Sequence, residues 1–281
     1  MSIAPNRSRL VFQKLEPDLV KLSSKPRPDS VHRFRTGTRR LQILLGELSP
    51  KLDRSEKKLL KQLARIRKRA GKVRDLDVQL AALRSLKVPQ EPRRKTQLVN
   101  HLIELRRQQE KKLRKAADKA TVREIRKRLK RAAKRFNPKT AHDPLVAAKA
   151  MLNQPEHAAA PLTEAVLHQY RILSKRARYA AEFASPSPAA EKFIAELKVL
   201  QDALGDWHDW LTLRETAIQH VGEVRESPLV AELHNVTGAK FRHAVAALSR
   251  TRDQLTTPSE QSARGPVPAA VKPRRDAASA A

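Results

Sequence analysis

A line of hydrogen-bond donors at helical spacing is the first feature of this sequence that could carry chemistry. It lies within residues 31–45 and consists of His32, Arg35, Arg39 and Gln42. Residues three and four positions apart share one side of a helix. Arginine suits anion binding because its planar guanidinium donates to two phosphate or carboxylate oxygens at once and keeps its charge. The stretch therefore predicts a helix that presents donors to an anion; the alternative is an ordinary solvated basic face.

An apolar arc runs along the same helix, beside the donors. Its members are Val31, Phe34, Leu41 and Leu45. A helix with such an arc buries it against a core. The core contact would then hold the neighbouring donors in a fixed direction.

The same arrangement recurs in the second half of the chain. The second set of donors is His168, Arg171, Lys175 and Arg178, and the matching apolar arc is Leu167, Tyr170, Ala177 and Ala181. A chance solvated face does not repeat histidine and two cations in the same angular order beside the core. The repeat favours a functional surface that was built twice.

A second pair of matching segments follows the two donor helices. Residues 63–77 and 197–211 each place an aspartate four positions after a glycine, as Gly71 with Asp75 and Gly205 with Asp209. Glycine inside a helix costs about 1 kcal/mol relative to alanine, so its recurrence predicts close helix packing. We interpret the repeated aspartate as a buried partner for one of the donor arginines; the alternative is a surface charge.

Composition indicates a polyanionic partner. The 281 residues include 59 Lys and Arg against 29 Asp and Glu, a net charge of +30. Such an excess suits nucleic acid, an anionic membrane surface or a phosphate polymer. Aromatic residues make up only 4% of the chain, which disfavours the stacking platforms of single-strand nucleic-acid binders. The absence of cysteine excludes disulfides and thiolate metal sites.

Helical periodicity with proline boundaries predicts an all-α fold of four helices followed by four more. The expected helices are 9–22, 29–48, 54–86, 93–136, 143–153, 162–184, 190–221 and 228–255, and residues 256–281 read as a disordered tail. No stretch approaches the apolar length of a membrane span, so we expect a cytoplasmic protein without a membrane partner.

The paired motifs resemble the CHAD family, the conserved histidine α-helical domain. The motif H-x-x-R-x-x-x-[RK]-R followed by L-x-x-[LI]-x-x-x-x-G-x-x-x-D occurs twice, and the resemblance covers residues 7–255. It implies two four-helix bundles, 7–137 and 141–255, related by a pseudo-twofold axis around a basic groove or central cavity. It also implies binding of long-chain inorganic polyphosphate and location at polyphosphate granules.

The resemblance also implies which residues contact the polymer. They are His32, Arg35, Arg39, Arg40, His168, Arg171, Lys175, Arg176 and Arg178. Gln42 departs from the family, which often has arginine there, and should contribute less. We expect the two histidines to act as neutral donors because neighbouring arginines disfavour protonation.

A further basic stripe occurs in the predicted helix 93–136. Its residues Arg126, Lys130 and Lys134 would extend the same surface or form a solvated face.

Two other function classes stay open at this point. The charge would also suit a nucleoid-type nucleic-acid-binding protein, with non-specific contacts. The adjacent His208 and Asp209 resemble the HD pair of metal-dependent phosphohydrolases, but the remaining histidines lack the spacing of further metal ligands. We therefore predict a non-enzymatic protein with no catalytic residues, metal or cofactor, and of undetermined oligomeric state.

Overall fold

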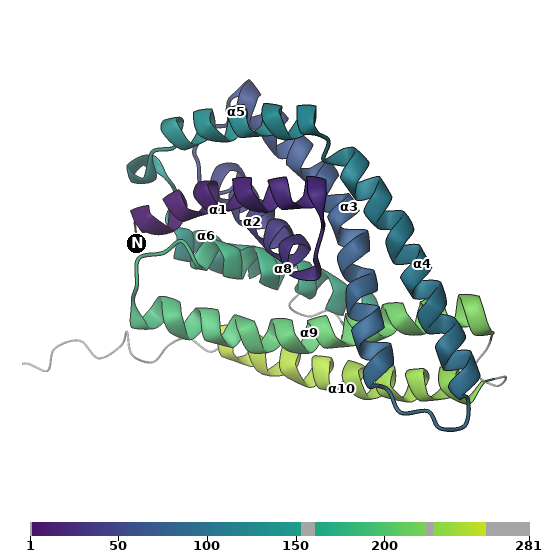
Figure 1. The fold of residues 1–281 in the computed structure, drawn as a ribbon. Coiled ribbons are helices and arrows are strands. Elements are labelled where there is room, and N and C mark those ends of the chain that lie inside the picture. The colour runs from purple at the N-terminus through teal and green to yellow at the C-terminus, as the bar shows by residue number, and fades with distance from the viewer. Residues whose placement is uncertain (1, 153–160, 223–226, 257–281) are drawn as a thin grey trace, which may run out of the picture.

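The structure, a computed structural model, describes residues 2–152, 161–222 and 227–256. Within these ranges the only β-type pairing is an isolated antiparallel bridge between Ile3 and Ala184. The all-α prediction is confirmed (Figure 1). The predicted tail, apart from Thr256, lies outside the described residues.

Proline marks most helix starts, as the sequence predicted. Pro5, Pro28, Pro92 and Pro188 each stand in the first turn of a helix, where the missing N–H is not needed. In the first half the helices are α1 (Pro5–Ser24), α2 (Pro28–Gly46), α3 (Arg54–Ser85), α4 (Pro92–Ala116) and α5 (Lys119–Arg135), followed by the 3₁₀ turn η1 (Pro138–Thr140). In the second half they are α6 (Pro144–Leu152), α8 (Glu164–Ala181), α9 (Pro188–Val221) and α10 (Pro228–Thr256).

The prediction of one long basic helix over residues 93–136 is wrong. The segment forms two helices, α4 and α5, that separate at Ala117 and Asp118. The Asp118 carboxylate accepts a hydrogen bond from the Thr121 N–H at 2.7 Å, so it caps a new helix. Good helix formers on both sides of the cap made the break hard to see in the sequence.

The hydrophobic core does not divide into one cluster for each half of the chain. The largest cluster combines α1, α2 and α3 with residues of α6, α8 and α9. A second joins the ends of the hairpins α3–α4 and α9–α10, and only the third lies wholly within the second half. The expected division into bundles 7–137 and 141–255 therefore stays a prediction.

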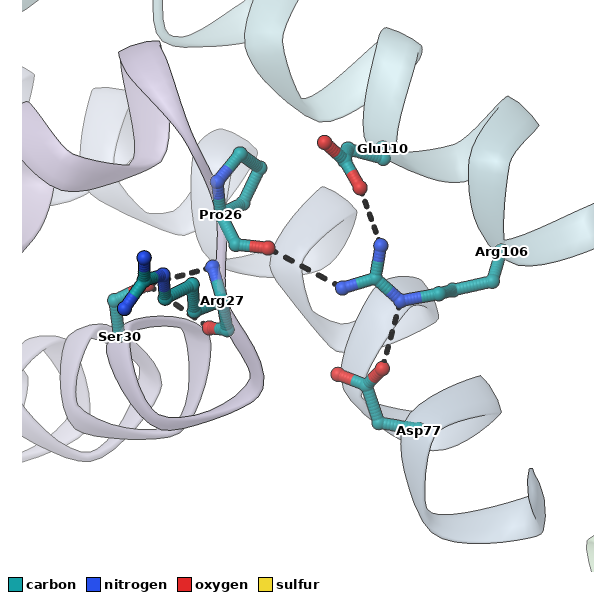
Figure 2. Close-up of polar contacts among 6 residues, drawn as sticks. All are labelled: Pro26, Arg27, Ser30, Asp77, Arg106 and Glu110. Atoms are coloured by element: carbon teal, nitrogen blue, oxygen red, sulfur yellow. Dashed lines mark hydrogen bonds and ion pairs between the residues drawn. The ribbon is translucent and has the colours of Figure 1, made fainter. Parts of the chain in front are cut away.

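A buried ionic network fixes α2 relative to α3 and α4. The guanidinium of Arg106 on α4 donates to Asp77 of α3 at 2.8 Å and to the carbonyl of Pro26 at 3.2 Å, and it also pairs with Glu110 (Figure 2). Pro26 lies two residues before α2, so this network ties the segment that leads into the first donor helix to α3 and α4. Asp77 faces α4 whereas Asp75 faces α2. The two carboxylates therefore point to different flanks of α3.

A membrane-spanning element is not found among the helices that the structure describes. None of them combines the length and the apolar character that crossing a bilayer requires.

Candidate anion-binding cleft

The two donor helices, α2 and α8, pack against each other and, with α3 and α9, enclose a cleft of about 620 Å³. We call it the basic cleft. Its lining includes these predicted contacts: His32, Arg35, Arg39, Arg171, Lys175 and Arg178. It also includes Arg74 of α3, which sequence reasoning missed because this residue belongs to neither donor helix.

Burial of the apolar arcs orients the donors. Val31, Phe34 and Leu41 of α2 are fully buried, and so are Leu167 and Ala177 of α8. Because each arc is held in the core, the adjacent flank of each helix must face the cleft. The predicted division of each helix into a core flank and a donor flank is confirmed.

In the first copy of the repeat, glycine makes room for an arginine. Arg35 donates to Asp75 at 3.3 Å, which confirms the predicted pairing, although the Asp75 side chain is 61% exposed rather than buried. A Cβ atom on Gly71 would lie 3.0 Å from Nη1 of Arg35, and no backbone of another helix comes as close. Close helix packing is therefore the wrong explanation for this glycine. A Cβ atom on Gly205 would have no neighbour within 4 Å.

Alanine substitutions at the two glycines should separate these roles. Gly205→Ala is expected to raise the free energy of unfolding by about 1 kcal/mol, the usual helix-propensity gain. Gly71→Ala is expected to gain less, because its methyl group must displace the Arg35 guanidinium. Urea unfolding of both variants measures the difference. Equal gains would show that Gly71 is not needed for the position of Arg35.

The second copy lacks the ion pair of the first. Asp209 faces Arg171 and Lys175, but no hydrogen bond joins it to either residue in the described structure. Burial raises the pKa of Asp209, and the two cations oppose that rise. Nε of Arg171 is buried and finds no hydrogen-bond partner among the described residues. Part of the donor capacity of Arg171 is thus unused in the protein itself.

The cations of the region fall into two groups. Several already pair with a carboxylate: Arg35 with Asp75, Arg40 with Glu182 at 2.7 Å, Arg176 with Glu47 at 2.6 Å, and Arg178 with Glu182 at 3.7 Å. Among the described residues, other cations of the cleft have no carboxylate oxygen within 4.0 Å: Arg39, Arg74, Arg171 and Lys175. This second group, the unpaired cations, leaves the cleft with positive charge that an anion would neutralise.

Burial and neighbouring charges lower the pKa of three cations that line the cleft. Burial, followed by the charges of Arg171 and Arg39, lowers the pKa of Lys175 to about 7. Burial also lowers the pKa of Arg35 and of Arg171. A lowered pKa of a cation means that its surroundings disfavour the charged form, even where, as for Arg35, a carboxylate opposes the effect. The cleft therefore holds its positive charge at a cost in free energy.

The two repeat histidines occupy different places. Partial burial, then Arg74 and Arg35, lowers the pKa of His32, which agrees with the expected neutral donor. His168 does not line the cleft; its ring lies 5.5 Å from that of His208. Its role as a neutral donor stays a prediction.

The remaining predicted contacts lie outside the basic cleft. Arg40 lines an adjoining groove of about 1020 Å³ between α1, α2, α8 and α9, and Arg176 lines neither. The proposed extension residues Arg126, Lys130 and Lys134 stand on α5, which packs against α1 and α3, and none of them lines the cleft.

Gln42 accepts a hydrogen bond from Arg67 of α3. Arg67 is a further cation that the sequence did not single out. Burial, then the charges of Arg39 and Arg35, lowers its pKa. It therefore belongs to the same crowded set of positive charges.

His208 and Asp209 do not form part of a larger ligand cluster. In the parts of the chain that the structure describes, no three histidine or carboxylate side chains gather as a metal ion would require. Burial, then Arg171 and His168, lowers the pKa of His208 to about 3.

Comparison with known proteins assigns the chain to a family. The model of the CHAD domain matches residues 10–217, well over half of the chain. The chain belongs to the CHAD family. Among curated proteins, none matches the sequence.

Two solved structures share the CHAD fold seen here. The crystal structure of the CHAD domain from the plant Ricinus communis has a TM-score of 0.64 and 19% identity, with 87% of each chain covered. PptA from Streptomyces chartreusis has a TM-score of 0.59 and 17% identity, with 90% of this chain and 100% of that chain covered. At these identities the likeness concerns the fold.

Proposed function

We propose that this CHAD protein binds long-chain inorganic polyphosphate in the basic cleft and catalyses no reaction on it. The observation that carries the proposal is the set of unpaired cations. They come from α2, α3 and α8 and are Arg39, Arg74, Arg171 and Lys175. No single helix could assemble them, so the fold itself gathers uncompensated charge around one space.

The chemistry of the polymer suits this lining. Polyphosphate carries a negative charge on each unit and has no bases, so its recognition needs only positioned cations and neutral donors. Arg39 and Arg171 would donate to phosphate oxygens, and His32 would add a donor that brings no further charge. Membership of the CHAD family, whose resemblance first implied this ligand, supports the same assignment. Location at polyphosphate granules would follow from the binding.

The cleft favours polyphosphate over nucleic acid. It is lined by residues of five helices, α2, α3, α8, α9 and α10, and has a volume of about 620 Å³, a space for a narrow chain. Duplex DNA carries its phosphates on the outside of a wide cylinder and would meet only the rim. Tyr179, the one Phe, Tyr or Trp residue in the described lining, is buried and offers no platform for stacked bases.

The test is a titration with long-chain polyphosphate over a series of salt concentrations, with duplex DNA as competitor. We expect the affinity to fall steeply as salt rises, because binding releases counterions, and DNA at equal phosphate concentration to displace little polymer. If DNA displaced polyphosphate as well as polyphosphate itself does at equal phosphate concentration, a site dedicated to polyphosphate would be contradicted. Release of orthophosphate in the presence of a divalent metal would instead support the phosphohydrolase alternative.

A further inference from the structure

Lys175 is the only lysine among the described residues that line the basic cleft. It is half-buried, and no carboxylate of the described structure pairs with it. Three positive groups face Lys175: Arg171 of its own helix, and Arg39 and Arg35 of α2. Asp209 faces it from α9 as the opposing negative charge.

These surroundings favour the uncharged amine. With a pKa of about 7, roughly half of the molecules hold a free amine at Lys175 at neutral pH. A lysine of ordinary pKa does so in fewer than about one molecule in 1000. Desolvation and adjacent cations are the two features that turn a lysine into a nucleophile in enzymes. Here they occur in a space lined by guanidinium groups that attract phosphate.

We propose that Lys175 is a modification site at which acyl phosphates, the mixed anhydrides of carboxylic and phosphoric acids, acylate the protein. The proposal rests on the phosphate affinity proposed for the cleft. Arg39 of α2 and Arg171, which lies four residues before Lys175 on α8, are the donors for the phosphate group of the reagent. The carbonyl carbon would then lie beside the free amine.

The reaction needs no further reactant. The lone pair of Lys175 Nζ attacks the carbonyl carbon, a C–N bond forms, and the C–O bond to phosphate breaks. The electron pair of that bond leaves with the phosphate, which takes one amine proton and departs as hydrogen phosphate. The product is an amide without charge, so acylation removes one of the unpaired cations. It should therefore weaken the binding of a polyanion.

The experiment exposes the full chain briefly to acetyl phosphate at pH 7 and quantifies each acetylated lysine by mass spectrometry. Lys198 and Lys130 are exposed and serve as internal references. We expect Lys175 to react faster than either by about tenfold or more, as its larger fraction of free amine implies. The rate of acetylation at Lys175 should rise through pH 7 and level off about one to two pH units above its pKa of about 7, whereas the rates at the exposed lysines should keep rising with pH. Equal rates at Lys175 and the exposed lysines would overturn the proposal.

Three controls identify the cause. Added polyphosphate should protect Lys175 but not Lys198. Arg39→Ala should slow the reaction at Lys175, because it removes a phosphate donor and a charge that favours the free amine. Brief acetylation should lower polyphosphate affinity in the wild type relative to its untreated sample, and Lys175→Arg, which lacks the amine, should show no such drop. A drop of equal size in Lys175→Arg would contradict the assignment to this residue.

The proposed function and this proposal can fail separately. Polyphosphate binding is measured on the untreated protein, and a neutral donor, the N-hydroxysuccinimide ester of acetic acid, is used in parallel. If the protein binds polyphosphate but acetyl phosphate acetylates Lys175 no faster than the exposed lysines, only the acylation proposal is overturned. Both proposals would be overturned if the protein did not bind polyphosphate and if the neutral ester, but not acetyl phosphate, acetylated Lys175 faster than the exposed lysines.

Discussion

Replacing Arg39 and Arg171 with alanine together is expected to weaken polyphosphate binding about 100-fold. Each residue supplies a charged donor with no carboxylate partner in the described structure, and a hydrogen bond to a charged group contributes about 1.5–3 kcal/mol. The slope of affinity against salt should also become shallower, since fewer counterions are released. Titration over a salt series measures both effects.

The matched control is the double variant Lys130→Ala/Lys134→Ala. It removes the same number of positive charges from exposed positions of α5, away from the basic cleft. Screening by salt limits the influence of such distant charges, so we expect a change of less than about threefold at physiological ionic strength. If the control lost as much affinity as Arg39→Ala/Arg171→Ala, the net positive charge of the whole surface, rather than the basic cleft, would account for binding.

The variants are not expected to unfold the protein. Neither Arg39 nor Arg171 pairs with a carboxylate of the described structure, so their removal breaks no internal ion pair, and burial lowers the pKa of Arg171, so its charge costs free energy. Urea midpoints close to the wild-type value would show that a loss of affinity comes from the site.

The sequence predicted the parts of the site that depend on local pattern. The spacing of Val31, Phe34 and Leu41 indicated which flank of α2 is buried, and the core confirms it. His32 and Arg171 follow from the same periodicity applied to α2 and α8. Most helix ends were visible because proline and capping residues mark them by local chemistry.

Pairing over long sequence distances was not visible in the same way. Arg40 and Arg176 occur in the same motif as Arg39, yet they pair with Glu182 and Glu47, each in the opposite half of the chain. Only the three-dimensional structure separates these compensated arginines from the unpaired ones. Arg74 was missed for a similar reason, since α3 brings it to the cleft from outside both donor helices.

The two copies of the motif differ in their electrostatics. In the first copy, Gly71 leaves space for Arg35, which meets Asp75. In the second, Nε of Arg171 has no hydrogen-bond partner among the described residues, and burial raises the pKa of Asp209. The two motifs have identical spacing in the sequence, yet Arg35 pairs with a carboxylate and Arg171 pairs with none in the described structure. The uncompensated copy should contribute more to anion binding, because no internal ion pair has to be broken.

The stability of the cleft depends on a residue outside it. Arg106→Leu is expected to lower the free energy of unfolding by about 3 kcal/mol, because it leaves the carboxylate of Asp77 buried without its partner. The side chain of Asp77 is 8% exposed and that of Arg106 is 19% exposed. The second oxygen of Asp77, Oδ2, is already buried without a hydrogen bond in the part of the chain that the structure describes, so that part supplies no alternative partner. Urea unfolding measures the loss.

The neighbouring residue provides the control for this prediction. Arg107→Leu removes the same charge from the same helix, but Arg107 is 69% exposed and lies 3.7 Å from Glu104, itself 57% exposed. Exposed pairs contribute less than about 1 kcal/mol, so this variant should stay close to the wild type. If both variants lost the same free energy, helix α4 would depend on its charge pattern rather than on the network. A larger loss of unfolding free energy in Arg106→Leu than in Arg107→Leu would support the role of the network. Arg106 contacts the segment before α2 through the carbonyl of Pro26. We therefore expect the intact network to help position the donors of α2 in the basic cleft.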